Sequence, residues 1–243
     1  MSEVRSQNVR GQKSAGGESV GQRVVKMYRL ILFDLDETLY PRSAKLMDAI
    51  TERINQYIAN KFSVPIEQAA ELRRRFRGLY GTALRGMMEE GYPVNIDEYF
   101  EYVHDIELDG VLAADPRLRD MLLGIPLRRA VLTNSNIEHA LRILQHMGIA
   151  DCFERVIDIR ALSFRNKPDP LSYQIALEML RVTPREVIFV EDTPVNTRAA
   201  RAIGMTTILI ECPPSDAADY FLDNVLDVGP LVAHLLNSKQ KSS

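Results

Sequence analysis

Two aspartates that stand two residues apart are the first side chains whose spacing predicts chemistry. Asp34 and Asp36 follow the apolar run 30–33, which has the β-branched and aromatic residues of a buried strand. Residues i and i+2 of an extended chain point the same way, so both carboxylates would leave the strand on one side. A divalent cation such as Mg²⁺ binds oxygen ligands and relieves the repulsion between such close carboxylates. By themselves, the two aspartates fit a metal site and an ordinary turn equally well.

A second acidic pair, Glu191 and Asp192, follows the apolar run 187–190. Thr193 precedes Pro194 and is predicted to cap the helix that this proline begins, which leaves the two acids without a structural role. Four carboxylates at one edge of a sheet would repel one another strongly unless a cation lies among them. We therefore expect this pair and the earlier pair to share a metal site.

Two further segments have the donors that an anion needs. Thr133, Asn134 and Ser135 offer hydroxyl, amide and backbone N–H groups just before a predicted helix, although the same residue types also serve as ordinary helix caps. Lys167 stands before a proline and is the only lysine in residues 62–238, in a chain with 23 arginines and 7 lysines. Chance alone could place it there, but a compact ammonium group can contact a carboxylate and a phosphoryl oxygen together.

The positions of these side chains depend on predicted strands that alternate with helices. Short apolar runs predict strands at 30–33, 129–132, 155–159, 187–190 and 205–210. Helical periodicity and capping residues predict helices at 136–147, 170–181 and 194–203, and a further helix that begins at 116. This alternation predicts an α/β fold, a Rossmann-like parallel sheet with helices on both faces. Ligands of such sheets bind beyond the carboxyl ends of the strands, where all of these polar segments would meet.

A segment without strand signals, residues 41–112, separates the first strand from the rest of the sheet. Helices are predicted at 43–62 and 66–79, in a short stretch after Gly81, and at 96–104 behind a capping box. The segment leaves the sheet and returns to it at the same edge. We therefore expect a small all-α cap domain over the site, with the core formed by residues 27–40 and 113–237.

The ends of the chain are expected to be disordered. Residues 1–26 are rich in Ser, Gly, Gln and charge, and residues 238–243 are also polar. Met27 stands at the junction with the core and is a possible alternative start of the protein.

Composition excludes several classes of protein. The 243 residues are 46% hydrophobic and 26% charged, which is typical of a globular domain with an insertion. Residues 28–243 carry a net charge of −6, which argues against a nucleic-acid partner. There is no apolar run of transmembrane length and no signal-peptide stretch, so we expect no membrane partner and a cytoplasmic location. The two cysteines and four histidines show no metal-binding spacing, and the histidines are interpreted as surface or core residues.

Four motifs in this order resemble those of the haloacid dehalogenase-like phosphohydrolases over essentially all of residues 28–212. They are Asp34-x-Asp36-x-Thr38, Thr133-Asn134, Lys167-Pro168 and Glu191-Asp192. The helical insertion is similar to the α-helical cap of the C1 class of that family. Residues 33–40, 80–86 and 132–135 are similar to its pyrimidine 5′-nucleotidase branch.

The resemblance implies roles for the core residues. Asp34 would be the nucleophile that forms an aspartyl-phosphate, and Asp36 would be the general acid and then the general base. An acid needs a raised pKa, which the neighbouring carboxylates of Asp36 are expected to supply. Thr133 and Asn134 would hold the phosphoryl group, and Lys167 would steady both that group and the nucleophile.

The same resemblance implies a Mg²⁺ site formed by Asp34, the backbone carbonyl of Asp36, Asp192 and Glu191. Which of the last two is the inner ligand stays open. In the cap, Tyr80 and Arg85 are candidate substrate contacts, although helix-surface or core packing explains them equally well.

The function expected from these motifs is a Mg²⁺-dependent phosphomonoester hydrolase acting on a small phosphorylated metabolite, in particular a pyrimidine nucleoside 5′-monophosphate. A phosphosugar phosphatase or mutase of the same fold is an alternative, as is a non-catalytic regulatory protein that keeps the fold. A 2-haloacid dehalogenase is disfavoured, because that chemistry needs no metal and no acid at the position of Asp36. The oligomeric state is not predicted.

Overall fold

A computed structural model describes residues 28–237 of the chain. The predicted tails, residues 1–26 and 238–243, and the possible start at Met27 lie outside the described residues. None of the helices between residues 28 and 237 is both long enough and apolar enough to cross a membrane.

The described residues form one parallel sheet of six strands in the order β3-β2-β1-β4-β5-β6. β1 lies between β2 and β4, with Phe33 opposite Val131 on one side and Val190 on the other. The strands are β1 (Leu30–Phe33), β2 (Arg128–Leu132), β3 (Arg155–Ile157), β4 (Val187–Glu191), β5 (Thr206–Ile210) and β6 (Tyr220–Leu222). The predicted α/β fold is therefore confirmed, and the chain reverses its direction of travel across the sheet at β1 and β4, where such folds bind ligands.

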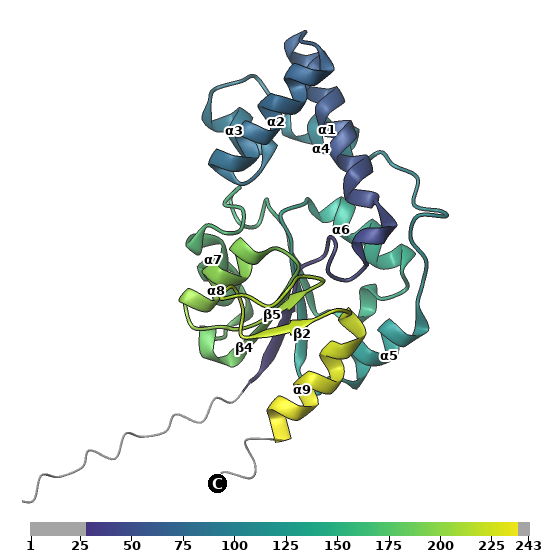
Figure 1. The fold of residues 1–243 in the computed structure, drawn as a ribbon, viewed down its shortest axis with the longest axis vertical. Coiled ribbons are helices and arrows are strands. Elements are labelled where there is room, and N and C mark those ends of the chain that lie inside the picture. The colour runs from purple at the N-terminus through teal and green to yellow at the C-terminus, as the bar shows by residue number, and fades with distance from the viewer. Residues whose placement is uncertain (1–27, 238–243) are drawn as a thin grey trace, which may run out of the picture.

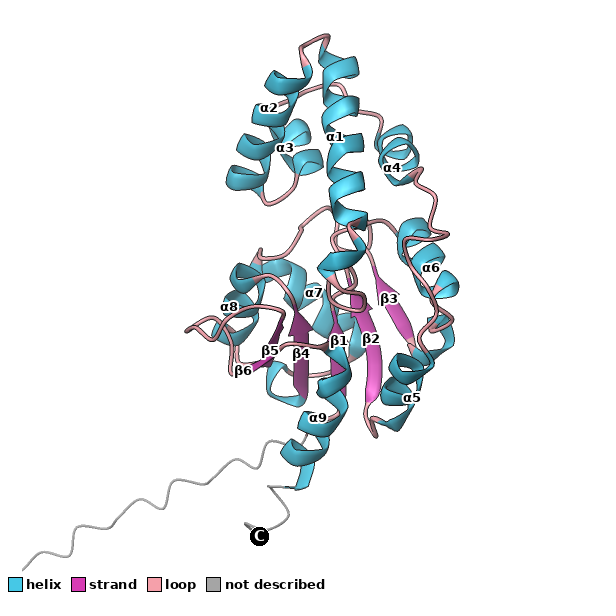
Figure 2. Ribbon diagram, turned by 45° about the vertical axis from the view of Figure 1, so that its right-hand side comes forward, coloured by secondary structure: helices cyan, strands magenta, loops and turns pink. Residues whose placement is uncertain are grey.

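Helices cover both faces of the sheet (Figure 2). Because side chains of a strand alternate between faces, Ile31 and Phe33 pack into one apolar cluster and Leu30 and Leu32 into another. The first cluster includes side chains of α5 (Pro116–Gly124), α6 (Ile137–His146) and α9 (Val228–Asn237). The second includes side chains of α7 (Pro170–Leu180) and α8 (Pro194–Ala202).

Four helices between β1 and β2 stand beyond the carboxyl ends of the strands (Figure 1). They are α1 (Leu46–Phe62), α2 (Ile66–Tyr80), α3 (Ala83–Glu89) and α4 (Ile96–His104). They bury their own apolar cluster around Tyr57, Phe76 and Tyr99. The first turns of α1 belong to the core instead, since Leu46 and Ile50 pack into the first sheet cluster. The domain boundaries at residues 41 and 112 remain predictions.

The ends of several elements show local determinants that the sequence predicted. Asn95 accepts the backbone N–H groups of Asp97 and Glu98, and the side chains of Asp115 and Asp169 cap α5 and α7 in the same way. The predicted helix at 43–62 is interrupted at Lys45, whose φ of 59° separates a 3-10 turn (Arg42–Ala44) from α1. Further 3-10 turns are Ala150–Cys152, Pro184–Glu186 and Val225–Asp227.

Several local predictions were incomplete or wrong. The strand expected at 155–159 ends at Ile157, and neither β6 nor α9 was predicted. Glu191 is the last residue of β4 rather than the first residue of the following loop. Thr193 occupies the N-cap position of α8 but makes no side-chain capping bond, and its hydroxyl instead donates to Asp192.

Two glycines of the cap provide a matched test of its packing. A Cβ atom on Gly86 would lie 2.4 Å from the Cβ of Phe76, which is fully buried, whereas a Cβ atom on Gly78 would meet nothing within 4 Å. We expect Gly86→Ala to lower the free energy of unfolding by about 1–3 kcal/mol through overpacking. Gly78→Ala should raise it by about 0.5–1 kcal/mol, because alanine is the better helix former. Urea unfolding followed by circular dichroism checks both, and equal effects would contradict this description of the cap.

Candidate active site

A cavity of about 410 Å³ lies between the four cap helices and the carboxyl ends of β1, β2 and β4. Its floor carries the acids and the lysine that the sequence singled out: Asp34, Asp36, Lys167, Glu191 and Asp192. Residues far apart in the chain therefore meet at the predicted edge of the sheet. A cavity of this volume suits a small metabolite.

Lys167 is held between two acids at the bottom of this cavity. Its Nζ lies 2.5 Å from Oδ1 of Asp34 and 2.8 Å from Oε2 of Glu191. All three side chains are buried, with Lys167 only 2% exposed. The second oxygen of Asp34 accepts a hydrogen bond from the hydroxyl of Thr38, 3.1 Å away. Asp34 is therefore fixed at both oxygens by residues of two predicted motifs.

The protonation of this cluster reflects its burial. Burial and the nearby charge of Glu191 raise the pKa of Asp34 to about 7, although Lys167 opposes the shift. Burial also raises the pKa of Glu191 to about 7, again against the effect of Lys167. Burial would lower the pKa of Lys167, but the two acids outweigh it and raise that pKa above its ordinary value. One ammonium group thus compensates two carboxyl groups only in part.

Glu191 is saturated with hydrogen bonds. Oε1 accepts the backbone N–H groups of Asp192 and Thr193 at 3.1 and 3.2 Å. Oε2 accepts a hydrogen bond from Nζ of Lys167 and another, at 3.0 Å, from the side-chain amide of Asn196 on α8. Asn196 was not predicted, and only its position in the first turns of the helix after the acidic motif could have indicated it.

Asp192 has one strong partner. Its carboxylate forms an ion pair with Arg42, whose guanidinium also donates to the backbone carbonyl of Asp192 at 3.1 Å. Arg42 lies 3.7 Å from Glu37 as well. Burial raises the pKa of Asp192. No local sequence pattern indicated Arg42, which contacts this acid from the 3-10 turn that leads into the cap.

Three of the acids could hold a metal ion. Asp34, Glu191 and Asp192 each offer a carboxylate oxygen, and these three oxygens lie within 4.8 Å of one another. An all-oxygen donor set suits a hard cation such as Mg²⁺. The residues present therefore fit the expected metal, and the partial charge compensation by Lys167 leaves room for a further positive charge.

Asp36 points into a different set of contacts. Its carboxylate accepts hydrogen bonds from Tyr40 at 2.7 Å and from Ser135 at 3.2 Å, and Nε2 of His139 lies 3.2 Å away. Burial would raise its pKa, but the hydrogen bond and charge of His139, together with Tyr40, lower it to about 2. The expectation of a raised pKa is therefore wrong for this arrangement, because hydrogen-bond donors surround Asp36 more closely than other acids do.

A pair of stacked histidines connects Asp36 to the cap. The rings of His139, from α6, and His104, the last residue of α4, have centroids 3.9 Å apart and are tilted by 18°. Burial and the charge of His139 lower the pKa of His104 to about 3, so that its ring is neutral. The sequence interpretation of both residues as surface or satisfied core residues missed this contact, because 34 positions separate them in the chain.

The predicted phosphate ligands lie beside Lys167. Asn134 lines the cavity, but its side-chain amide donates to the backbone carbonyl of Lys167 at 3.2 Å and accepts its N–H at 2.8 Å. Thr133 is fully buried below the cavity floor, and its Oγ1 accepts the N–H of Ser135. In this arrangement Asn134 positions the lysine, and phosphate binding by either residue remains a prediction.

The two candidate cap residues have different positions. Arg85 lines the cavity and forms ion pairs with Asp169 at 3.3 Å and Glu89 at 3.5 Å. Tyr80 is not among the residues that line it, and its hydroxyl lies 3.4 Å from Glu90. Substrate contact by Arg85 and Tyr80 remains a prediction.

Comparisons with known proteins agree with this geometry. The profile of the family described as haloacid dehalogenase-like hydrolase matches residues 28–204. Phosphoglycolate phosphatase of Pectobacterium atrosepticum is 26% identical over 234 residues, which cover 88% of this chain and 96% of that protein. Phosphate metabolism protein 8 of Saccharomyces cerevisiae is 24% identical over 74% of this chain, and the chain spans only 61% of that relative's length.

A solved structure shares the fold. The HAD phosphatase from Thermococcus onnurineus superimposes with a TM-score of 0.59 at 18% identity, covering 84% of this chain and 97% of the other.

The raised pKa of Asp34 predicts how stability depends on pH in metal-free protein. Between about pH 4.5 and pH 7 the unfolded chain has released the proton of Asp34 while much of the folded protein still holds it, so rising pH removes stability. Asp34→Asn cannot ionise, and we expect it to gain at least about 1 kcal/mol relative to the wild type over this interval.

Urea unfolding in EDTA at several pH values measures this difference. The lowered pKa of His104 makes stability rise with pH, but His104 is present in both proteins, so its contribution cancels in the difference between them. Asp120→Asn, at an exposed position on α5, is the matched control and should show a constant difference from the wild type. Parallel pH profiles for Asp34→Asn and the wild type would contradict the assignment.

Proposed function

The chain belongs to the haloacid dehalogenase-like hydrolases, and from this membership we propose that it is a Mg²⁺-dependent phosphomonoester hydrolase. The observation that carries the proposal is the buried contact of Lys167 with Asp34, at the floor of a cavity and within a cluster of three acids. A buried carboxylate held at a fixed angle by a lysine and a threonine suits a nucleophile that must meet a phosphorus atom in line.

In the proposed reaction, Asp34 attacks the phosphorus atom of the substrate. The new bond joins a carboxylate oxygen to phosphorus, and the bond from phosphorus to the alkoxide breaks. Asp36 would give a proton to the departing oxygen, which requires that the bound phosphate dianion raise its pKa from the value of about 2 set by His139 and Tyr40. It would then take a proton from the water that hydrolyses the aspartyl-phosphate. Inorganic phosphate leaves, and Asp34 is regenerated.

The other residues of the cavity floor hold the reacting groups in place and neutralise their charge. Lys167 stays in contact with Asp34 and offers its remaining hydrogen to a phosphoryl oxygen, while Asn134 keeps the lysine in place through its backbone. Mg²⁺ would be held directly by Asp34, Asp192 and the backbone carbonyl of Asp36, with the carboxylate of Glu191 beside them. When bound, it supplies positive charge that offsets the charge of the phosphoryl group during transfer.

We propose Asp192 rather than Glu191 as the inner metal ligand. Each oxygen of Glu191 already accepts two hydrogen bonds, whereas Asp192 is held by an exchangeable ion pair with the partly exposed Arg42. Glu191 would then act mainly by orienting Lys167.

Two substrate classes have support. The resemblance of residues 33–40, 80–86 and 132–135 to pyrimidine 5′-nucleotidases favours a nucleoside 5′-monophosphate, and a C1-type cap of four helices goes with it. The apolar part of the cavity wall, which includes Ile54, Phe100 and Phe164, suits a flat base. A small phosphorylated acid is the second candidate, because a relative named phosphoglycolate phosphatase aligns over nearly its whole length.

Hydrolysis of phosphate esters tests the proposal. We expect the wild type to release phosphate from p-nitrophenyl phosphate with Mg²⁺ and to lose this activity in EDTA. Asp34→Asn should lower kcat by at least about 10³-fold, since the nucleophile is gone. Asp120→Asn should keep the wild-type rate. Retained turnover in Asp34→Asn would exclude the aspartyl-phosphate route, and a wild type inactive on nucleotides, phosphoglycolate and sugar phosphates would favour a regulatory protein.

Binding of Mg²⁺ distinguishes the two acids at the end of β4. We expect Asp192→Asn to weaken the affinity for Mg²⁺ at least about 10-fold and to weaken it more than Glu191→Gln does, because only the former removes a direct ligand. Isothermal titration calorimetry measures the affinities. Asp216→Asn, an exposed acid distant in sequence from the motifs, serves as the control. A larger loss in Glu191→Gln would reverse the assignment of the inner ligand.

A further inference from the structure

Two arginines of the cap line the cavity without an acidic partner. Arg73 and Arg77 are four residues apart on α2, so their side chains share one face of the helix. Within residues 28–237, neither guanidinium has a carboxylate within ion-pair distance. Nε of Arg73 donates to the side chain of Asn55 at 2.8 Å, a neutral group, and Arg77 makes no side-chain hydrogen bond there.

The other cations of the cavity wall are compensated. Arg42 pairs with Asp192, Arg85 pairs with Asp169, and Lys167 contacts Asp34 and Glu191. Two positive charges that are four residues apart on a helix repel each other. Burial lowers the pKa of Arg73, and the charge of Arg77 lowers it further. Glu37 is also on the wall and forms its ion pair with Arg42; the charge of Arg77 acts on Glu37 as well and opposes the rise of its pKa, but the two make no ion pair.

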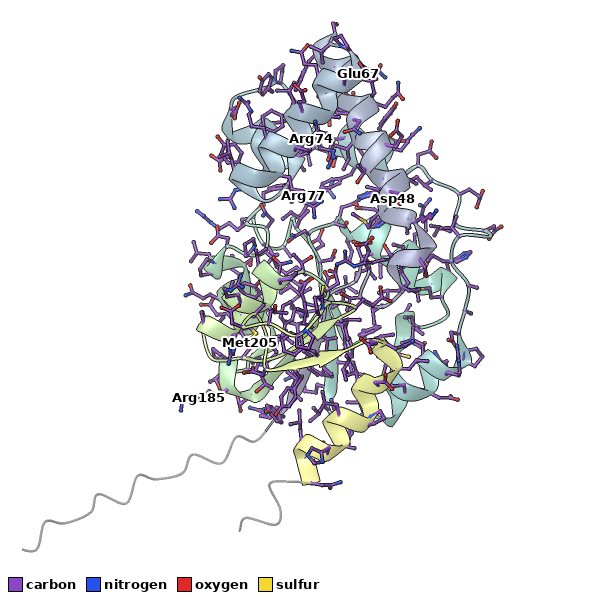
Figure 3. The ribbon with its side chains drawn as sticks, viewed as in Figure 1. Asp48, Glu67, Arg74, Arg77, Arg185 and Met205 are labelled. Carbon is purple, nitrogen blue, oxygen red and sulfur yellow. The ribbon has the colours of Figure 1, made fainter. Side chains whose placement is uncertain are left out.

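Position at the cavity, rather than burial, distinguishes this pair from the other arginines of α2, because Arg73 is half-buried and Arg77 is exposed. The same helix carries Arg74 and Arg75, which do not line the cavity: Arg75 pairs with Glu90, and Arg74 is exposed, as Arg77 is, but lies away from the cavity. Figure 3 shows Arg77 at the end of the cap that faces the core, whereas Arg74 lies farther up the cap. Among the arginines of α2 that the structure describes, Arg73 and Arg77 alone line the cavity, and neither makes an ion pair.

We propose that Arg73 and Arg77 bind a second anionic group of the substrate, on the part that leaves when the phosphoryl group is transferred. The inference rests on the proposed hydrolase function, in which Asp34 and Lys167 fix the phosphoryl end at the core side of the cavity. A guanidinium group binds a carboxylate or a phosphate through paired N–H donors. The substrate class is thus a phosphomonoester that also carries a carboxylate or a second phosphate.

This subsite separates the two substrate candidates. A phosphorylated carboxylic acid supplies a negatively charged partner for the two arginines. A nucleoside monophosphate with an uncharged base fills the apolar wall of the cavity but leaves both guanidinium groups uncompensated. The subsite therefore favours the phosphorylated acid, or a bisphosphate, as the preferred substrate.

Inert phosphonates test the subsite without turnover. Propylphosphonate carries one anionic group, whereas 3-phosphonopropionate adds a carboxylate and propane-1,3-bisphosphonate adds a second phosphonate. Calorimetric titration with Mg²⁺ should show the wild type binding at least one of the doubly anionic compounds about 10-fold or more tightly than propylphosphonate. Which of them is preferred tells a carboxylate from a phosphate as the second group.

Variants of Arg77 and Arg74 show which side chain causes the preference for doubly anionic phosphonates. In Arg77→Ala and in Arg77→Gln, which keeps the bulk of the side chain, the ratio of the two affinities should fall to about one. Arg74→Ala, which removes an arginine from the same helix outside the cavity, should keep the wild-type ratio. A wild type that binds all three phosphonates equally or not at all, or Arg77 variants that keep the preference, would overturn the inference.

The binding experiment and the hydrolysis experiment can fail separately. If the wild type prefers the doubly anionic ligands through Arg77 but hydrolyses no ester, the subsite stands and the proposed hydrolase function fails. If it hydrolyses p-nitrophenyl phosphate while the Arg77 variants change no ligand preference, the hydrolase function stands and the subsite is overturned.

Discussion

The contact of one buried lysine with two buried acids is the constraint on which the rest of the site depends. Lys167 comes from the loop between β3 and α7, Asp34 from the end of β1 and Glu191 from the end of β4. Three charged groups of this kind are costly to remove from water, and a buried ion pair often contributes little net stability. The geometry must therefore be held by other parts of the fold. Parallel pairing sets the ends of β1 and β4 side by side, and Asn134 clamps the backbone of the lysine.

The cap belongs to this arrangement as much as the sheet does. Its first helix is rooted in the core through Leu46 and Ile50, while the cluster around Phe76 includes Ile159 from the core loop after β3. Arg42 lies where the chain passes from the core into the cap, and its side chain forms an ion pair with Asp192 of the core. Cap and core thus meet through apolar contacts at the sides and charged groups in the middle. The charges on the two sides of the cavity differ: acids and one lysine on the core, and arginines on α2.

Asp36 shows how two neighbouring acids acquire different properties. Asp34 is surrounded by buried acids with one lysine among them, and its pKa rises to about 7. Asp36, two residues along, meets Tyr40, Ser135 and His139, and its pKa falls to about 2. At the edge of the sheet, Asp34 therefore lies among acids, whereas Asp36 lies among hydrogen-bond donors. Through His139 and its stacking partner His104, the second environment also contacts the cap.

Much of the fold and the identity of the motif residues followed from the sequence alone. Apolar runs that end in polar residues marked five of the six strands, and capping residues such as Asn95 and Asp115 marked helix starts, because these signals act over a few neighbouring positions. The parallel sheet then gathered Asp34, Lys167 and Asp192 by a general rule of such folds. The strand β6 was not predicted; it has three residues, all only partly buried, whereas the equally short β3 lies within the longer apolar run 155–159.

Only the tertiary structure decided how each side chain is used. No local pattern places His139 beside Asp36, Arg42 beside Asp192, or the pair Arg73 and Arg77 on the cavity wall, since these contacts join distant segments. The pKa of an acid likewise depends on burial and on neighbours from other elements, so the expectation for Asp36 was wrong although its motif was found. The sequence determined which residues meet at the edge of the sheet, and the packing of cap against core determined their partners and their charge.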